Sequence, residues 1–160
     1  MLQVTTGTEL HCRERIAEAG IEAVVPTRIM PELRGGEWRE REIVMLPGYV
    51  FVHCRGTVPD YYRLSAIQDT IRILPGGGRY DPVPDEQMQW ILTLANGGEP
   101  WGISEAVLGD GWTIRVLSGP LIGRESEIVS WDRRRRRAKI CIRVLEQQRM
   151  IDVGLKEGVT

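Results

Sequence analysis

The chain has 160 residues, of which 42% are hydrophobic and 27% charged, and its formal net charge at pH 7 is −1. This composition is typical of a soluble globular protein and excludes a disordered chain. No apolar run approaches the ~20 residues that span a bilayer, and the N-terminus lacks the pattern of a secretion signal. We therefore expect a cytoplasmic protein with no membrane partner.

The spacing of the cysteines argues against disulfides and metal sites, and the distribution of charge indicates where nucleic acid could bind. Cys12, Cys54 and Cys141 are far apart and form no Cys-x-x-Cys pair, so we expect free thiols and no disulfide, metal or other cofactor. Residues 1–98 carry ten basic and thirteen acidic side chains, whereas residues 99–160 carry eleven and nine. Any contact with nucleic acid is therefore expected in the second half of the chain.

The first 96 residues mix helical and strand periodicities and predict one α+β domain. In chain order the predicted elements are a strand at 1–5, a helix from the N-cap Thr8 to Gly20, a strand at 21–25, a hairpin at 27–45 with its tip at Gly35-Gly36, a strand at 46–52, a helix at 59–66, a strand at 71–74, a glycine loop at 75–80 and a helix at 84–96. The last helix is predicted to place Met88, Ile91, Leu92 and Ala95 on one apolar face.

After residue 96 the pattern changes to a predicted linker followed by short strands only. Residues 97–110 mix glycine, proline and serine with few candidates for a core, so we interpret them as a linker. After it, short strands are predicted at 112–116, 127–131, 138–145 and 150–153. Such a run of short strands predicts a small β-barrel at 111–160, and Trp112 and Trp131 are expected to pack it.

Residues 46–52 are the most strongly patterned segment. A Pro47-Gly48 turn leads into Tyr49-Val50-Phe51-Val52, whose side chains alternate between two apolar faces. One face must cover the core, while the other needs either a helix of this chain or a partner. A central strand buried on both sides remains the alternative.

These motifs resemble the NusG family of transcription elongation factors. Residues 46–52 are similar to the PGYVFV strand of its N-terminal domains, and the surrounding matches are Thr6-Gly7-Thr8-Glu9, Pro26 and Pro82-Val83-Pro84. The second half resembles the family's KOW domain at Gly109-Asp110, Gly119-Pro120-Leu121-Ile122-Gly123 and Arg137-Ala138-Lys139-Ile140. The resemblance implies an NGN-type sandwich at 1–96, with a four-stranded antiparallel sheet and flanking helices, and a KOW (SH3-like) barrel at 111–160.

The resemblance also implies a non-enzymatic, monomeric factor that binds RNA polymerase. In the family, the aromatic face of the PGYVFV strand forms an apolar groove for the clamp helices of the largest polymerase subunit, which is helix-in-groove recognition. The polymerase-binding residues carried over are Pro47, Tyr49 and Phe51, with Tyr61, Tyr62 and Arg63 at the segment that reaches across the cleft. The chain departs from the family at Leu2 and Gln3, where an aromatic pair is usual.

Residues 133–137 are five consecutive arginines, placed where the family has a hairpin turn between two barrel strands. Guanidinium groups bind phosphates and stack on bases, so we expect this turn to bind nascent RNA. The predicted RNA-binding set is Arg124, Arg133, Arg134, Arg135, Arg136, Arg137 and Lys139. A solvated turn that keeps a small barrel soluble remains the alternative, and Trp38 has no predicted role.

Two positions bear on which kind of family member this is. Arg124 and Ser126 replace an apolar residue and a glycine that help housekeeping members contact a ribosomal protein and the Rho factor. With Asp152-Val153-Gly154-Leu155, the pattern resembles antiterminators of the LoaP type. We therefore expect an antitermination factor, with other elongation factors as further candidate partners. The alternatives are a housekeeping factor that couples polymerase to Rho or the ribosome, and an RNA-processing enzyme, which no histidine or carboxylate constellation supports.

Overall fold

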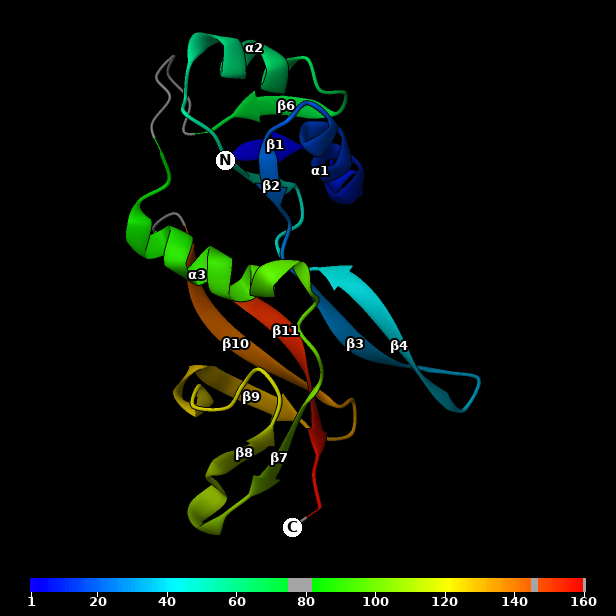
Figure 1. The fold of residues 1–160 in the computed structure, drawn as a ribbon. Helices are drawn as coiled ribbons and strands as arrows, with labels where there is room; N and C mark the ends of the chain where they lie inside the picture. Colours follow the sequence, from blue (N-terminus) through cyan, green and yellow to red (C-terminus); the bar gives the residue numbers. More distant parts are fainter. Residues whose placement is uncertain (75–81, 145–146, 160) are drawn as a thin grey trace. The chain divides into compact units, whose positions relative to one another are not determined.

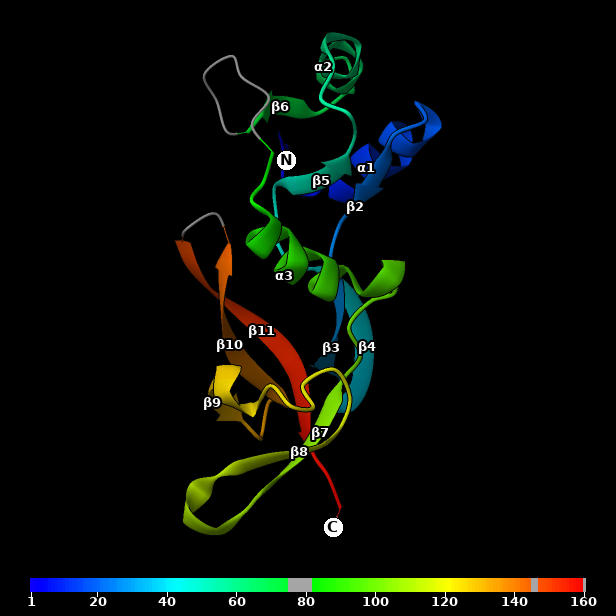
Figure 2. The same cartoon turned by 60° about the vertical axis from the view of Figure 1, so that its left-hand side comes forward.

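The computed structural model describes residues 1–74, 82–144 and 147–159, which divide into two compact units. The first unit comprises Met1–Pro26 and Val44–Gly98, and the second comprises Thr27–Ile43 and Glu99–Thr160. Figure 1 labels the helices and strands of both except β5, which is labelled in Figure 2. The glycine loop predicted at 75–80 lies outside the described residues. None of the helices in the described part of the chain has the length and hydrophobicity needed to cross a lipid bilayer.

The first unit is an antiparallel sheet with three helices, as the sequence predicts. Its elements are β1 (Leu2–Val4), α1 (Glu9–Glu18), β2 (Glu22–Val24), β5 (Tyr49–His53), α2 (Val58–Ser65), β6 (Thr70–Ile73) and α3 (Asp85–Ala95). The strands lie in the order β2-β5-β1-β6, and each neighbouring pair is antiparallel. Strand β5 is therefore central, with β1 on one side and β2 on the other.

The core of this unit forms because apolar residues of α1 recur at the helical spacing and meet apolar residues of the strands. Cys12 and Ile16 of α1 are fully buried in one cluster with Leu2, Val4 and Val50. Burying one such side chain stabilises the fold by about 1.5–3 kcal/mol. In α3 the buried residues are Ile91, Leu94 and Ala95, whereas Leu92, which was predicted on the same apolar face as Ile91 and Ala95, is 55% exposed.

The second unit is a curled sheet of short strands, joined by a hairpin from the first half of the chain. Its elements are β3 (Thr27–Arg34), β4 (Glu37–Val44), β7 (Ser104–Leu108), β8 (Ile114–Ser118), β9 (Ile128–Asp132), β10 (Arg137–Val144) and β11 (Gln147–Glu157). Strands β7 to β11 form one sheet in the order β8-β7-β11-β10-β9, in which only the β7–β11 pair is parallel among the described pairings. Figure 2 shows the curl of this sheet.

Two expectations for the second half need correction. Strand β7 lies inside residues 97–110, the predicted linker, because the alternating Ser104 and Ala106 are both fully buried and the strand pairs with β8 and β11. Trp112 does not pack the barrel, since its side chain is 83% exposed in the turn between β7 and β8. Trp131 is half-buried, and its Nε1 donates a hydrogen bond to the Leu155 carbonyl at 2.9 Å.

Candidate functional site

A buried carboxylate fixes the turn that leads into the central strand β5. Glu9 at the start of α1 is only 3% exposed, and its carboxylate accepts hydrogen bonds from the backbone N–H of Gly48 at 2.7 Å and of Gly7 at 3.0 and 3.1 Å. Gly48 has a φ of +87°, a conformation that glycine adopts without strain. Thr8, the predicted cap, instead donates its hydroxyl to the Thr5 carbonyl at 2.6 Å.

This turn sets the two faces of β5. Val50 is fully buried in the core cluster with α1, so Phe51 must point to the opposite face of the sheet. There Phe51 lines a groove of 740 Å³ within the first unit. Its ring is only 2% exposed, because other residues of the unit, among them Met1 and Met88, line the groove around it. Phe51 is therefore the floor of the groove and not a protruding ring.

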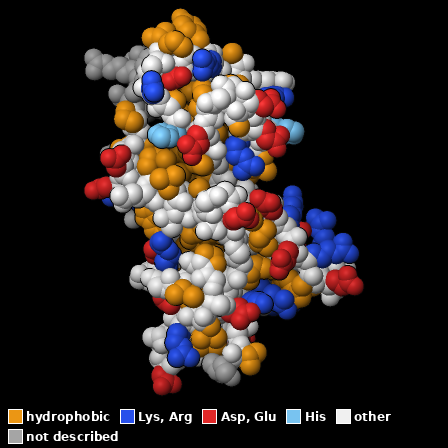
Figure 3. Space-filling view, viewed as in Figure 1, with side chains coloured by type: hydrophobic (Ala, Val, Ile, Leu, Met, Phe, Trp, Pro, Cys, Tyr) orange, Lys and Arg blue, Asp and Glu red, His pale blue; other side chains and the backbone are white. Residues whose placement is uncertain are grey.

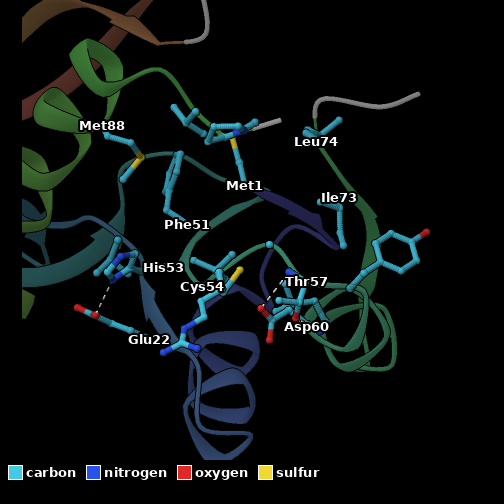
Figure 4. A pocket seen from close by; sticks show the side chains of 18 of the residues that line it. Met1, Glu22, Phe51, His53, Cys54, Thr57, Asp60, Ile73, Leu74 and Met88 are labelled. Carbon is cyan, nitrogen blue, oxygen red and sulfur yellow. Dashed lines mark hydrogen bonds and ion pairs between the residues drawn. The ribbon is translucent and has the colours of Figure 1, made fainter. Parts of the chain in front are cut away.

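The wall of the groove is apolar and partly open. Tyr61 of α2, Ile73 of β6 and Leu92 of α3 line it, and Figure 4 labels Ile73 among them. Tyr61 is 39% exposed and Leu92 55%, so apolar side chains remain available at the surface. Figure 3 shows hydrophobic side chains gathered on this face of the first unit. A groove with partly exposed apolar side chains is a surface that an apolar helix face could cover.

Polar groups mark the rim of the groove. His53 Nδ1 lies 3.3 Å from the Glu22 carboxylate, and both side chains are exposed. Thr57 and Asp60 form a capping box at the start of α2, with both hydrogen bonds at 3.3 Å, which explains why a helix begins at Val58. Burial lowers the pKa of the Met1 amino group, while the nearby Cys54 raises it by a smaller amount.

The predicted polymerase-binding residues do not all meet at this groove. Phe51 and Tyr61 line it, whereas Pro47, Tyr49, Tyr62 and Arg63 do not. Tyr49 is half-buried and Pro47 and Arg63 are exposed. Tyr62 is 68% exposed and its ring packs edge-on against that of Tyr61, with 5.8 Å between centroids. Of the two aromatic residues predicted on one face of the strand, Phe51 forms the floor of the groove and Tyr49 does not line it.

A second candidate surface is the arginine turn, residues 133–136, between β9 and β10. Arg133, Arg134 and Arg135 are exposed. Arg133 contacts Glu157 in an ion pair and lies 6.0 Å from the Trp131 ring centroid, while the backbone N–H of Arg135 donates to Asp132 at 2.9 Å. The turn presents guanidinium groups to solvent, but carboxylates partly neutralise them.

The remaining residues of the predicted RNA-binding set lie on β10, directly after the turn, and in the segment before β9. On β10, Arg137 and Lys139 both contact the Asp152 carboxylate, at 3.8 and 2.8 Å. Arg124 lies outside the turn, in the segment before β9, and pairs with Glu127 at 3.1 Å. Among the described residues no group of three or more histidine, cysteine or acidic side chains is arranged to hold a metal ion.

The sequence interpretation missed three residues that complete these surfaces. Met88 and Leu92 of α3 line the groove, whereas helical periodicity predicted only that they share an apolar face with Ile91 and Ala95. Trp38 of β4 had no predicted role, and the Arg136 guanidinium carbon lies 4.1 Å from its ring centroid. The signal for Trp38 was a single large aromatic residue in the charged strand Glu37–Val44.

The family model and the curated relatives that match this chain all belong to one family. Residues 1–92 match the family model NusG, described as transcription termination factor nusG. Two curated relatives are both named transcription termination/antitermination protein NusG. The one from Buchnera aphidicola is 22% identical over 143 residues, covering 85% of this chain and 76% of that protein. The one from Pseudomonas aeruginosa is 31% identical over 117 residues, covering 67% of this chain and 64% of that protein.

The fold comparison agrees with the sequence comparison. A solved structure titled "Domain interaction in Thermotoga maritima NusG" matches with a TM-score of 0.54 and 26% sequence identity. The match covers 97% of this chain and 90% of the other, so it includes both units.

Proposed function

The chain belongs to the NusG family of transcription termination and antitermination factors, and from that premise we propose that its first unit binds RNA polymerase through the groove above Phe51. The expected occupants are the clamp helices of the largest polymerase subunit. The observation that supports this is the partly exposed apolar wall, since Tyr61 and Leu92 leave apolar area uncovered on a unit that already has its own core. An apolar helix face that covered these side chains would gain the free energy of their burial.

The chain acts by binding and not by catalysis. A factor that contacts polymerase more tightly in its closed, elongating state shifts the enzyme toward that state by the difference in binding free energy. Pausing and termination then become less frequent. This is the antitermination activity that the sequence resemblance implies.

The second unit binds the nascent transcript in this proposal. The exposed Arg133, Arg134 and Arg135 support it, because guanidinium groups on a tight turn can reach successive phosphates. A housekeeping role, in which this unit contacts Rho or a ribosomal protein, is the second candidate. Pull-down with the full chain separates the two: retention of Rho or a ribosomal protein without affinity for RNA favours the housekeeping role.

The polymerase proposal is tested by changing the exposed apolar wall of the groove. We expect Leu92→Asp to weaken binding to bacterial core RNA polymerase about tenfold or more, because a carboxylate would lose its hydration against an apolar helix. Leu92 is largely exposed, so the fold should tolerate the change. Leu33→Asp is the matched control, since Leu33 is 59% exposed on β3 in the second unit. Equal affinity of the two variants for polymerase would contradict the proposal.

A further inference from the structure

The hairpin of β3 and β4 precedes most of the first unit in the chain, yet its contacts lie in the second unit. The backbone N–H of Ile29 donates to the Trp101 carbonyl at 2.7 Å, and the N–H of Trp101 donates to the Thr27 carbonyl at 2.9 Å. Trp101 itself is only 2% exposed. These bonds continue strand-like pairing from β3 to the segment that leads into β7.

A close backbone approach joins the hairpin to β11 as well. A Cβ atom added to Gly154 of β11 would lie 3.1 Å from the Ile29 carbonyl oxygen and 2.8 Å from Ile103 Cγ1. A larger residue at this position would require the Ile103 side chain or the β3 backbone to shift. Glycine at position 154 therefore allows the hairpin to pack directly against the barrel.

The hairpin also contacts the arginine turn. The Arg136 guanidinium carbon lies 4.1 Å from the centroid of the Trp38 ring, which is the geometry of a cation–π interaction. Arg136 has a φ of +54°, which is unfavourable for a side chain of its size. The backbone N–H of Leu155 donates to the Arg136 carbonyl at 3.0 Å, which supports the same conformation. Trp38 thus helps to hold the last residue of the turn.

Positive charge continues from the turn onto the hairpin. Arg28 of β3 belongs to the same charged cluster as Arg137 and Lys139, around the single Asp152 carboxylate. Burial lowers the pKa of Arg28, the Asp152 carboxylate raises it, and the charge of Arg137 lowers it again. Together with the turn, this surface holds seven cations, Arg28, Arg133–Arg137 and Lys139, against the three carboxylates of Asp132, Asp152 and Glu157. The rest of the hairpin adds three cations, Arg34, Arg39 and Arg41, and four carboxylates, Glu32, Glu37, Glu40 and Glu42, so ten cations face seven carboxylates. The excess of positive charge favours a polyanion.

We propose that the β3–β4 hairpin is part of the RNA-binding surface of the second unit, with Trp38 as the residue that positions Arg136 for a phosphate of single-stranded RNA. This inference rests on the proposed RNA-binding function of the arginine turn. The hairpin supplies the Trp38 ring and Arg28, and β10 supplies Arg137 and Lys139. A flexible single strand can bend to follow a surface built from three elements.

The test measures the affinity of the full-length protein for a fluorescently labelled single-stranded RNA over a range of salt concentrations. Trp38→Leu removes the aromatic face, and we expect it to weaken RNA binding about threefold to fivefold. We also expect the slope of log K against log salt to become shallower by up to about 0.7, as for one lost phosphate contact. Trp38→Phe keeps an aromatic face and should restore most of the affinity. A lost fold would not be rescued in this way.

A double-mutant cycle isolates the contact. Arg136→Gly removes the guanidinium and accepts the positive φ, so the turn can keep its conformation. In that background Trp38→Leu should have no further effect on RNA affinity. If the two losses are instead independent, or if Trp38→Leu leaves affinity unchanged, Trp38 does not position Arg136 and the inference is wrong.

Arg134→Gln separates this inference from the function on which it depends. If Arg134→Gln weakens RNA binding and Trp38→Leu does not, the arginine turn binds RNA without the hairpin. If the wild-type protein shows no salt-dependent affinity for RNA, both proposals fail. Duplex DNA of the same length serves as the second probe, and binding to it as tight as to RNA would overturn the assignment to a single strand.

Discussion

At the scale of single residues, Glu9 has the largest effect on the geometry of the groove, although it is not one of the aromatic residues predicted to bind polymerase. Its buried carboxylate holds the N–H groups of Gly7 and Gly48, and through Gly48 it fixes where β5 begins. A shift of β5 by one residue would exchange its two faces, so that Val50 would leave the core and Phe51 would enter it. The carboxylate therefore determines which side chains line the groove.

Removing this carboxylate should destabilise the first unit. We expect Glu9→Ala to lower the free energy of unfolding by about 2–3 kcal/mol, because the buried N–H of Gly48 and the part-buried N–H of Gly7 lose a charged acceptor. Urea unfolding measures the loss. Glu14→Ala, at an exposed position of the same helix, is the control and should change stability by less than about 0.5 kcal/mol. Similar losses in both variants would contradict the role assigned to Glu9.

Residue patterns predicted the position of β5 but not the exposure of its rings. Alternation along a strand assigns Val50 and Phe51 to opposite faces, and the structure agrees. What covers each face depends on residues distant in sequence, such as Met88 of α3, which lines the groove at Phe51. Exposure of Trp112 was missed for a related reason, since it lies in a turn at a φ of +63° and not in a strand.

At the scale of elements, local periodicity located most helices and strands, because caps, glycines and apolar spacing are local signals. The capping box of Thr57 and Asp60 and the glycine turn at Gly35 and Gly36 are examples. Pairing between distant elements is not encoded in this way. The place of the β3–β4 hairpin depends on contacts such as Trp38 with Arg136, and β7 depends on its partners β8 and β11.

The turn after β8 should tolerate no side chain at Gly119. A Cβ atom there would lie 2.6 Å from Ser104 Cα at a φ of +96°, so Gly119→Ala should cost about 3 kcal/mol or more of stability. Gly123→Ala is the control, because φ is +74° but no atom lies within 4 Å, and we expect a loss of about 1–2 kcal/mol. Thermal unfolding followed by circular dichroism compares the two. Equal losses of stability would show that the close contact with Ser104 does not add to the cost of a side chain at position 119.

At the scale of the whole molecule, the account assigns different partners to the two units. Variants of the groove and of the arginine turn should therefore lose different parts of the read-through activity. In transcription across a terminator, Leu92→Asp should abolish any read-through caused by the factor, because it would no longer reach polymerase. Arg134→Gln should remove only the part of read-through that depends on the transcript's sequence. If both variants lose all activity together, or neither does, the division of roles is wrong.

The salt dependence of RNA binding reports how many arginines of the turn meet phosphates. Five contacts would give a slope of about −3.5 for log K against log salt. Since Arg137 is paired with Asp152, whereas Trp38 holds Arg136 toward a phosphate, we expect the four arginines of the turn, residues 133–136, to dominate, with a slope of about −2.8. Fluorescence anisotropy at several salt concentrations measures it. A slope near zero would indicate a solvated turn with no role in RNA binding.

The most direct test of the polymerase proposal uses a cysteine that already lines the groove. Cys54 is exposed there, whereas Cys12 is buried, so in a Cys141→Ser variant a photoactivatable crosslinker can be attached to Cys54 alone. After illumination with RNA polymerase, mass spectrometry identifies the residues that were joined. The account predicts crosslinks to the clamp helices of the largest subunit, and their loss in Leu92→Asp. Crosslinks confined to other parts of the polymerase, or none above those of a denatured control, would contradict it.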